Sequence, residues 1–475
     1  MRARTPLVVA VALAAVVVGS SAVPAVANQA TLTQISSDLY TGGKAQHATE
    51  AEADTYHFGS TVVSTFQVGR FRTGGAVNIG WATSTDAGAT WQQGVLPGIT
   101  VAEGGPYERA SDPVVAYDAR HGTWLINTLD LGDLNDLSVS RSADGLTWSL
   151  PVLVVAGGEG SFIDKNWIAC DNTGTSPHYG TCYVQYDDAG AGGQMVMVRS
   201  TDGGLTWSVP AAVAGASGIG GQPVVQTSGR VVVPYRDGGD GSMRSFSSVD
   251  GGLTWSAPVL IALSTGHAPT GMRAPRLPVA EVDGAGRVYV AWQDCRFRVG
   301  CAANDIVLST SDDGTAWTPV VRIPIAAIDS TVDAFIPGLG VDRTSSGATA
   351  RLALVYYFYP DAGCGKKACA LQVGYASSTS GGASWSTPVT LAGPMSLPWI
   401  ADAGGAMVGD YLSVSILGDT ALSAFAVARE PLKGKVFDQA MYAPIGLTVT
   451  GGLEAATSAG ARQIAGGHPI EVTAY

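Results

Sequence analysis

The chain has 475 residues, of which 14% are charged, and its formal net charge is −12 at pH 7. An acidic excess of this size excludes a general affinity for nucleic acid or for anionic lipid surfaces, so we expect neither as a partner. The 62 glycines are typical of an all-β protein with many turns.

The first 27 residues have the features of an export signal. Arg2 and Arg4 precede an apolar run at 7–18, and Ala-Val-Ala at 25–27 provides small residues for cleavage. The apolar run is shorter than the about 20 residues that a membrane-spanning helix needs. The sequence therefore predicts a signal peptide over 1–27 and a secreted protein without a membrane span.

One turn motif recurs six times, and each copy ends in a tryptophan three residues after a glycine. The copy at 200–207 reads Ser-Thr-Asp-Gly-Gly-Leu-Thr-Trp. In this motif, the Asp-box, Asp and Ser side chains bond to the turn backbone and glycine supplies a positive φ angle. A recurring unit that cannot bury its own apolar face indicates an array of modules. The six tryptophans are Trp91, Trp148, Trp207, Trp255, Trp317 and Trp385.

Short segments of alternating polarity lie between these turns and predict strands. Three such strands per unit, and one after each tryptophan, make the four-stranded blades of a propeller. A seventh unit without an Asp-box covers 407–444, and one hypothesis is that residues 31–40 supply its missing strand. We therefore predict a single all-β propeller over 28–446, with seven blades favoured over six, and a C-terminal tail at 447–475.

Six cysteines in an exported chain indicate disulfides. Fifteen pairings are possible, and closeness along the chain favours Cys170–Cys182, Cys295–Cys301 and Cys364–Cys369. A metal site is the alternative. The chain has no Cys-x-x-Cys, and only His178 lies near a cysteine pair, so we expect no metal there.

The innermost strand of each propeller blade begins near the central funnel, where ligands bind. The residues that open these strands are mostly acidic, and basic and aromatic residues flank them. Carboxylates in one wet pocket can differ in pKa and divide acid and base roles. Alternatively, they cap turns and pair with neighbouring arginines. The strand-opening residues are Glu52 or Asp54, Asp112, Asp164, Gln222, Arg276, Asp333 and Asp410, flanked by Arg109, Lys165, Arg273, Tyr107, Trp167 and Trp399.

Oxygen ligands are plentiful on this acidic ring, so a calcium ion is a conceivable occupant. No Asp-x-Asp-x-Asp loop supports it. We expect no cofactor.

The repeated turns and the blade pattern resemble the sialidase-like superfamily of secreted propellers over essentially the whole mature chain. In sialidases, an arginine triad binds the substrate carboxylate, a Tyr–Glu pair forms the nucleophile and an aspartate is the acid/base. Arg236, which ends Val-Val-Val-Pro-Tyr-Arg, resembles the second triad arginine, and Tyr411 resembles the tyrosine. The motif of the first arginine is absent, and Gln226 or Gln222 stands where the activating glutamate is expected. A tyrosine without a carboxylate base is a weak nucleophile.

Two functions of different class follow. The first is a secreted glycan-processing enzyme of sialidase-like type, an exo-acting glycoside hydrolase with an acidic-sugar pocket in the funnel. The second is a non-catalytic propeller that binds a glycan, a cell-wall polymer or a protein. Either way, we expect a monomer whose partner is a carbohydrate or another extracellular polymer. The candidate catalytic residues are Tyr411, Asp410 and Asp112, and the candidate substrate-binding residues are Arg236, Arg273, Arg276, Arg109, Asp164, Trp167 and Asp333.

Overall fold

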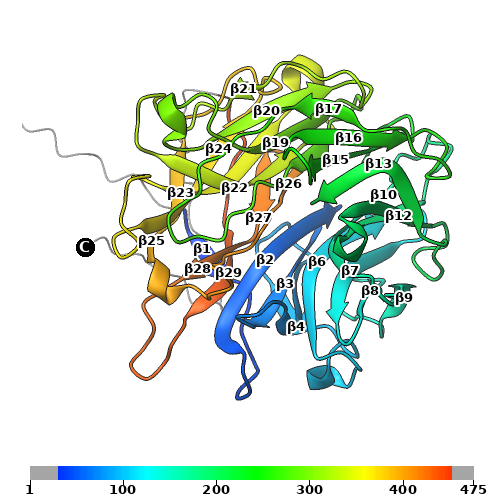
Figure 1. Cartoon of the computed structure of the whole chain (residues 1–475), viewed down its shortest axis with the longest axis horizontal. Coiled ribbons are helices and arrows are strands. Elements are labelled where there is room, and N and C mark those ends of the chain that lie inside the picture. Colours follow the sequence, from blue (N-terminus) through cyan, green and yellow to red (C-terminus); the bar gives the residue numbers. More distant parts are fainter. Residues whose placement is uncertain (1–29, 452–475) are drawn as a thin grey trace, which may run out of the picture.

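A computed structural model describes residues 30–451. The predicted signal peptide lies outside the described residues, as does the predicted tail from 452 onward. Within them, no helix has the length and apolar composition to cross a membrane. The sheets are arranged around a central axis, which confirms the predicted all-β propeller (Figure 1).

Strands β2 to β25 form six successive four-stranded antiparallel meanders. The first three are β2 (Gln46–Phe58), β3 (Thr61–Arg70), β4 (Ala76–Ser84) and β5 (Gln92–Val95); β6 (Arg109–Asp118), β7 (Thr123–Leu131), β8 (Asn135–Ser142) and β9 (Val152–Val155); and β10 (Ile163–Cys170), β11 (Cys182–Asp188), β12 (Gln194–Ser200) and β13 (Ala211–Ile219). The next three are β14 (Val224–Val225), β15 (Val231–Asp237), β16 (Met243–Ser248) and β17 (Val259–Ala262); β18 (Val279–Val282), β19 (Val288–Asp294), β20 (Asp305–Ser311) and β21 (Val321–Arg322); and β22 (Asp333–Val341), β23 (Leu352–Tyr359), β24 (Ala370–Ser378) and β25 (Val389–Ser396).

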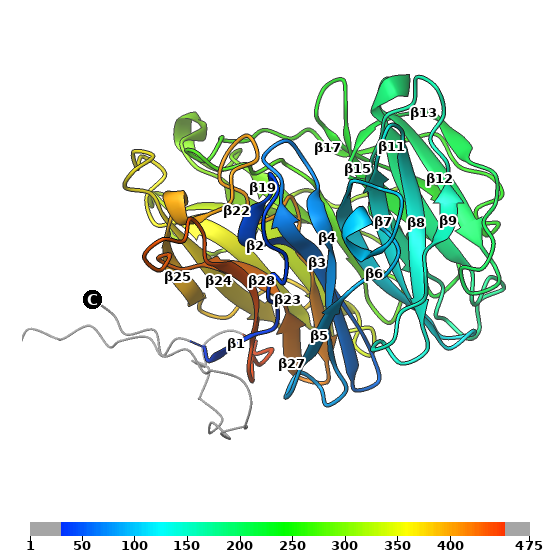
Figure 2. The same cartoon turned by 90° about the horizontal axis from the view of Figure 1, so that it is seen from below.

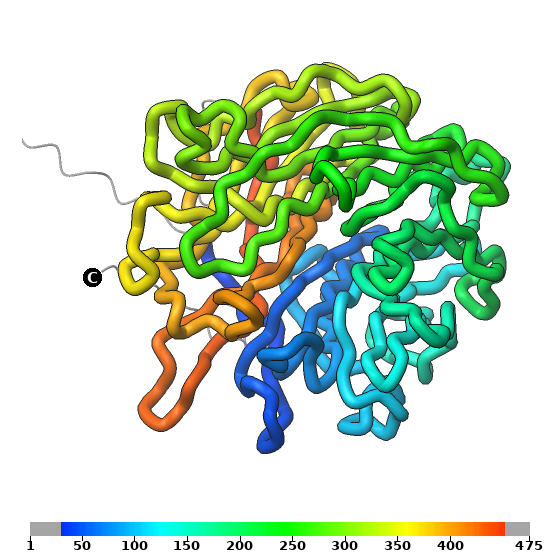
Figure 3. The backbone as a smooth tube through the Cα atoms, viewed as in Figure 1, coloured from blue at the N-terminus to red at the C-terminus, as the bar shows by residue number. Residues whose placement is uncertain are grey.

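A further group of strands joins the two ends of the chain. It contains β26 (Val414–Leu417), β27 (Thr420–Ser423), β28 (Phe425–Ala428), β29 (Gln439–Pro444) and β1 (Leu32–Gln34). β1 pairs with β29 in antiparallel register, so the first and last described segments lie side by side (Figure 3). The hypothesis of an N-terminal closing strand is confirmed, and the grouping favours seven blades over six.

Five short 3-10 turns lie in the connections. They are η1 (Val101–Glu103), η2 (Ala189–Ala191), η3 (Val299–Cys301), η4 (Gly347–Thr349) and η5 (Leu397–Trp399). Apolar side chains that alternate along the strands pack between neighbouring sheets, where the largest fully buried side chains include Trp292, Tyr183 and Phe66.

The Asp-box turns have the predicted structural role. In the copy at 200–207, Asp202 accepts hydrogen bonds from the backbone N–H of Thr206 (2.9 Å) and from its hydroxyl (2.6 Å), and Ser200 Oγ accepts one from Gly204 N–H (2.9 Å). The copy that ends in Trp91 follows the last residue of β4. Gly75 directly precedes the first residue of β4 and lines the pocket described below, so the turn and the pocket lie at opposite ends of this strand. Figure 2 shows the strands running between these two faces of the ring.

The three predicted disulfides are present: Cys170–Cys182, Cys295–Cys301 and Cys364–Cys369. The first joins directly paired residues of β10 and β11. Each of the three closes a short loop, so each adds only modestly to stability.

The closure of the ring depends on a buried serine. Ser36 Oγ accepts a hydrogen bond from Met441 N–H (2.7 Å) and donates one to Glu50 (3.2 Å). Ser36→Ala leaves a buried N–H of β29 without a partner. We expect the free energy of unfolding to fall by about 1–3 kcal/mol, measured by urea denaturation. The neighbouring change Ser37→Ala, at a more exposed hydroxyl, is the control; an equal loss in both variants would contradict the closing role.

Candidate functional site

A pocket of about 540 Å³ lies at the end of the axis where the inner strands β2, β6 and β10 begin. Its walls come from at least four of the sheets. Its lining includes charged side chains of both signs, unlike the apolar layers between the sheets. Its polar lining consists of Arg70, Thr73, Ser111, Asp112, Asn135, Asp164, Lys165, Arg273 and Asp410.

Four inner strands are interrupted at the level of this pocket. β2, β6, β10 and β22 each shift register against their neighbour, as β-bulges do. Each bulge holds a non-glycine residue at positive φ: Glu52 (57°), Asp112 (47°), Lys165 (33°) and Ile336 (48°). Bulges change the direction of side chains and are common beside active sites. A positive φ angle raises the conformational energy of a non-glycine residue, so it persists only where the surrounding structure enforces it. The recurrence of the bulge explains why polar side chains converge here.

Buried side chains of neighbouring sheets satisfy the backbone groups that the bulges free. Asn166 Nδ2 donates to Asp112 O (3.0 Å), and Asp54 Oδ2 accepts from Val115 N–H (2.8 Å). Gln293 Oε1 accepts from the N–H of Ile336 (2.8 Å). These bonds connect each bulged strand to the sheet beside it.

Arg273 and Asp410 form an ion pair on one wall of the pocket. Arg273 Nε lies 2.8 Å and 3.1 Å from the two carboxylate oxygens of Asp410. The hydrogen bond to Asp410 raises the pKa of Arg273 further. The backbone fixes the pair, because Arg273 N–H donates to Ala406 O (3.0 Å), four residues before Asp410. The arrangement holds a permanent cation at the pocket surface.

Lys165 lies between a carboxylate and two aromatic rings. Its Nζ is 4.0 Å from Asp112 Oδ2, 3.8 Å from the ring centre of Tyr411 and 4.9 Å from that of Trp167. Ser111 Oγ donates to the other oxygen of Asp112 (2.8 Å). Asp112 is therefore held in place while it still lines the pocket.

The carboxyl groups around the pocket differ in proton affinity. Burial and the nearby charge of Asp112 raise the pKa of Asp164 to about 6 and that of Glu52 to about 8. Burial and the charge of Asp164 raise the pKa of Asp187, its partner across β10 and β11, to about 9. Like charges held close together cannot all ionise, so such a cluster contains both protonated and ionised members near neutral pH.

Tyr411 does not line the main pocket. Its ring is 7% exposed and its hydroxyl donates to Pro113 O (3.0 Å). Burial and the charge of Glu52 hold its pKa well above the usual range. Trp167 packs edge-on against it, with ring centres 5.2 Å apart. Both rings form the floor under Lys165, and Tyr411 is not an activated nucleophile.

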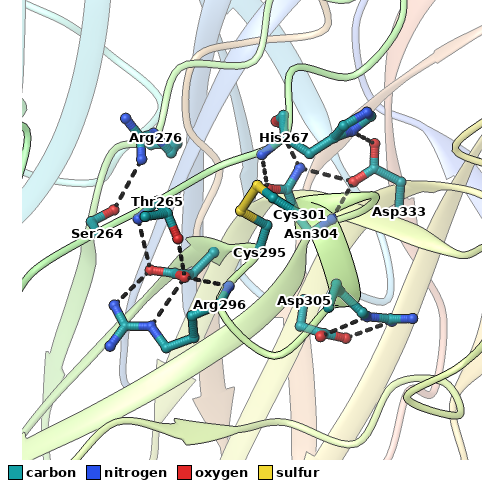
Figure 4. Close-up of a disulfide and its surroundings, with 12 residues drawn as sticks. Ser264, Thr265, His267, Arg276, Cys295, Arg296, Cys301, Asn304, Asp305 and Asp333 are labelled. Atoms are coloured by element: carbon teal, nitrogen blue, oxygen red, sulfur yellow. Dashed lines mark hydrogen bonds and ion pairs between the residues drawn. A yellow bond between two sulfur atoms is a disulfide. The ribbon is translucent and has the colours of Figure 1, made fainter.

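Asp333 and Arg276 lie outside the pocket lining. Asp333 accepts hydrogen bonds from Asn304 N–H (2.7 Å) and pairs with His267 Nδ1 (2.9 Å), so it holds a loop (Figure 4). Arg276 contacts Ser264 Oγ (3.4 Å), as Figure 4 also shows. Their predicted role in substrate binding gains no support from this geometry.

Arg236 and Arg109 also lie outside the lining. Arg236 is on β15, beside Ile219 of β13, which does line the pocket. Arg109 donates to Thr73 Oγ1 (2.9 Å) and to Gly74 O (3.1 Å). Arg109 thus supports a turn that lines the pocket, so its contribution is indirect.

Two charged groups of the site do not follow from the sequence pattern. Arg70 lines the pocket from the end of β3, and it contacts Gln67, which in turn contacts Glu52. Asp187 lies at the end of β11. Both lie at the end of the second strand of a blade, whereas the sequence pattern points only to residues at the start of the inner strands. Within residues 30–451, no cluster of three His, Cys, Asp or Glu side chains is arranged to hold a metal ion.

Comparison with known proteins identifies the family. Residues 63–323 and 132–391 match the BNR repeat-like domain, and the first match alone spans more than half of the chain. The chain belongs to this family. No curated protein matches it.

Solved structures with low sequence identity are similar over most of the chain. A lectin from Burkholderia pseudomallei is 14% identical, with 86% of this chain and 100% of that one covered and a TM-score of 0.48. An ulvan lyase is 12% identical, with 89% and 96% covered and a TM-score of 0.48. A protein of unknown function from Dyadobacter fermentans is 17% identical, with 74% and 98% covered and a TM-score of 0.45.

The raised pKa of Glu52 makes stability depend on pH. Folding disfavours the ionised form of Glu52. The contribution of this group to stability is therefore fully present below its usual pKa of 4.5, and it is lost as the pH rises through about 8. Glu52→Gln mimics the protonated form. We expect it to gain about 1 kcal/mol or more over wild type at pH 9, and little at pH 5, in urea denaturation. The exposed Glu108→Gln is the control; parallel pH profiles for wild type and Glu52→Gln would contradict the assignment.

Proposed function

We propose that the axial pocket binds a glycan and hydrolyses a glycosidic bond. The observation that carries the proposal is the pair Asp112 and Asp164, two carboxyl groups that line one pocket from adjacent inner strands. Most glycoside hydrolases use two carboxyl groups in different protonation states on either side of the bond. The pKa of about 6 for Asp164 keeps this group largely protonated in mildly acidic solution, below about pH 6.

Asp164 is the proposed general acid, which protonates the oxygen of the leaving group. Asp112 is the proposed partner, as the base that activates water or as the nucleophile. Lys165 and Ser111 keep Asp112 oriented, with the Lys165 ammonium 4.0 Å from one carboxylate oxygen and the Ser111 hydroxyl 2.8 Å from the other. This division of roles needs no activated tyrosine and no metal ion.

Arg273 and Arg70 are the proposed sugar-binding cations. Arg273 shares the pocket with its partner Asp410, and the pair offers both donors and acceptors to ring hydroxyls. Arg70 is buried, and its Nε has no hydrogen-bond partner within the described residues. A guanidinium of this kind suits an acidic substituent of a sugar.

Three disulfides fit an extracellular protein. We therefore retain secretion as part of the proposal, together with action as a monomer on an extracellular carbohydrate.

A non-catalytic glycan-binding propeller is the second candidate. The contacts of Asp410 with Arg273 and of Asp112 with Ser111 favour it, because carboxylates held in this way can serve recognition alone. Asp164 is held less tightly than Asp410 and Asp112, and this difference favours the hydrolase. Its Oδ1 accepts the N–H of Lys165 (2.9 Å), and its other oxygen has no protein donor within the described chain.

Single substitutions of the pair separate the two candidates. On a panel of oligosaccharides and aryl glycosides, we expect Asp164→Asn and Asp112→Asn each to lower kcat by about 10²–10⁴-fold. The exposed Asp133→Asn, in the nearby loop before Asn135, is the matched control and keeps its activity. A wild type that cleaves nothing yet retains glycans on an array would replace the hydrolase with the binding protein.

Tyr411→Phe distinguishes this mechanism from that of the sialidases. The change removes the hydrogen bond to Pro113 O, so we expect the stability to fall by about 1 kcal/mol. We expect kcat to stay within about threefold of wild type, because the hydroxyl is not the nucleophile. Activity and thermal unfolding are measured on the same sample, and a loss of several orders of magnitude in kcat at full folding would contradict the proposal.

A further inference from the structure

A second concave site lies beside the axial pocket on the same face of the ring. It is a groove of about 750 Å³, and its apolar side includes Met272, Leu397 and Phe437. The segment 271–273 separates the two sites: Arg273 lines the pocket, whereas its neighbour Met272 lines the groove. The backbone bridge between Met272 and Ala406 fixes this ridge. The groove is therefore adjacent to the site of the proposed function, across this ridge.

The groove has a positive lining in an acidic protein. Its charged residues are the cations Arg72, Lys366 and Lys367 and the single carboxylate Asp402, a net charge of 3 − 1 = +2. Arg72 and Asp402 pair with each other, which leaves the two lysines uncompensated. The whole chain carries −12. An anionic ligand is therefore attracted to this sector and repelled by most of the remaining surface.

The distribution of lysines along the chain points to the same sector. Four of the six occur on two loops, 361–369 and 429–438, and the second of these loops also contributes Phe437 to the groove. Figures 1 and 2 show both loops on one side of the ring. The six lysines are Lys44, Lys165, Lys366, Lys367, Lys433 and Lys435.

The lysines of the first loop are held by the fold. The disulfide Cys364–Cys369 closes the loop around them, and the stem of Lys366 packs close to Gly271 on the ridge. All four loop lysines are exposed, and within residues 30–451 none of them forms an ion pair. Holding the loop in place lowers the entropy that its side chains lose on binding a ligand.

We propose that this groove, which we call the lysine groove, binds the neighbouring units of an anionic polysaccharide whose reacting unit occupies the axial pocket. The inference rests on the proposed function and assigns its substrate class: a polymer with carboxylate or sulfate groups. The apolar side suits sugar faces, and the lysines suit charges that recur along a chain. A ligand of only one or two units occupies the pocket alone and does not reach the lysines.

The test compares ligand length and charge in one set of titrations. The probes are a long oligogalacturonate, galacturonate disaccharide and a neutral cello-oligosaccharide of equal length. We expect Lys366→Gln/Lys367→Gln to weaken binding of the long oligogalacturonate by about five- to tenfold at low salt, with a smaller effect at high salt. Binding of the disaccharide stays unchanged.

The control variant is Arg343→Gln/Arg230→Gln, which removes the same charge near the Asp-box face. An equal loss of long-ligand binding in this control would overturn the lysine groove, because only net charge would then matter. The proposal is also wrong if the wild-type protein shows no preference for the long anionic probe. It is wrong as well if the protein binds anionic lipid vesicles and only the lysine variant loses this binding. Failure of Asp164→Asn to affect cleavage concerns only the proposed function, so the two proposals fail separately.

Discussion

The site depends on the hydrogen bonds that connect the bulged inner strands across neighbouring sheets. A non-glycine residue at positive φ costs about 1–3 kcal/mol, and four such residues lie in the bulges of inner strands. The strain persists because buried side chains such as Asn166 and Gln293 bind the backbone that the bulges release. The same bonds hold neighbouring sheets in register. Contact between neighbouring sheets and convergence of the polar side chains therefore depend on the same bonds.

This constraint also governs the electrostatics. The bulges bring the charge of Asp112 close to both Glu52 and Asp164, and burial together with this charge raises the pKa of both groups. Lys165 and Arg273 compensate part of the charge but not all of it. Glu52 and Asp187, beside the axial pocket, therefore stay protonated at neutral pH. The lysine groove beside it has the opposite character, because its cations are exposed.

The sequence predicted the parts of the site that follow from the repeat. Asp112 and Asp164 lie near the start of the inner strands β6 and β10, Asp410 lies four residues before β26, and the repeat places these segments around one axis. Asp333 satisfies the same rule but does not line the pocket, because it begins β22 three residues before the bulge, whose residue is the apolar Ile336. Bulges leave no clear pattern in a single sequence. The side chains that close second strands, Arg70 among them, require the register that only coordinates provide.

The most direct test of the account is a crystal structure of the protein with the oligosaccharide that it retains most tightly. The account predicts density for a sugar ring in the axial pocket, with a glycosidic oxygen between the carboxyl groups of Asp112 and Asp164 and a ring substituent at Arg273. Density confined to the Asp-box face or to the outer edges of the sheets, with the axial pocket filled by water alone, would contradict it.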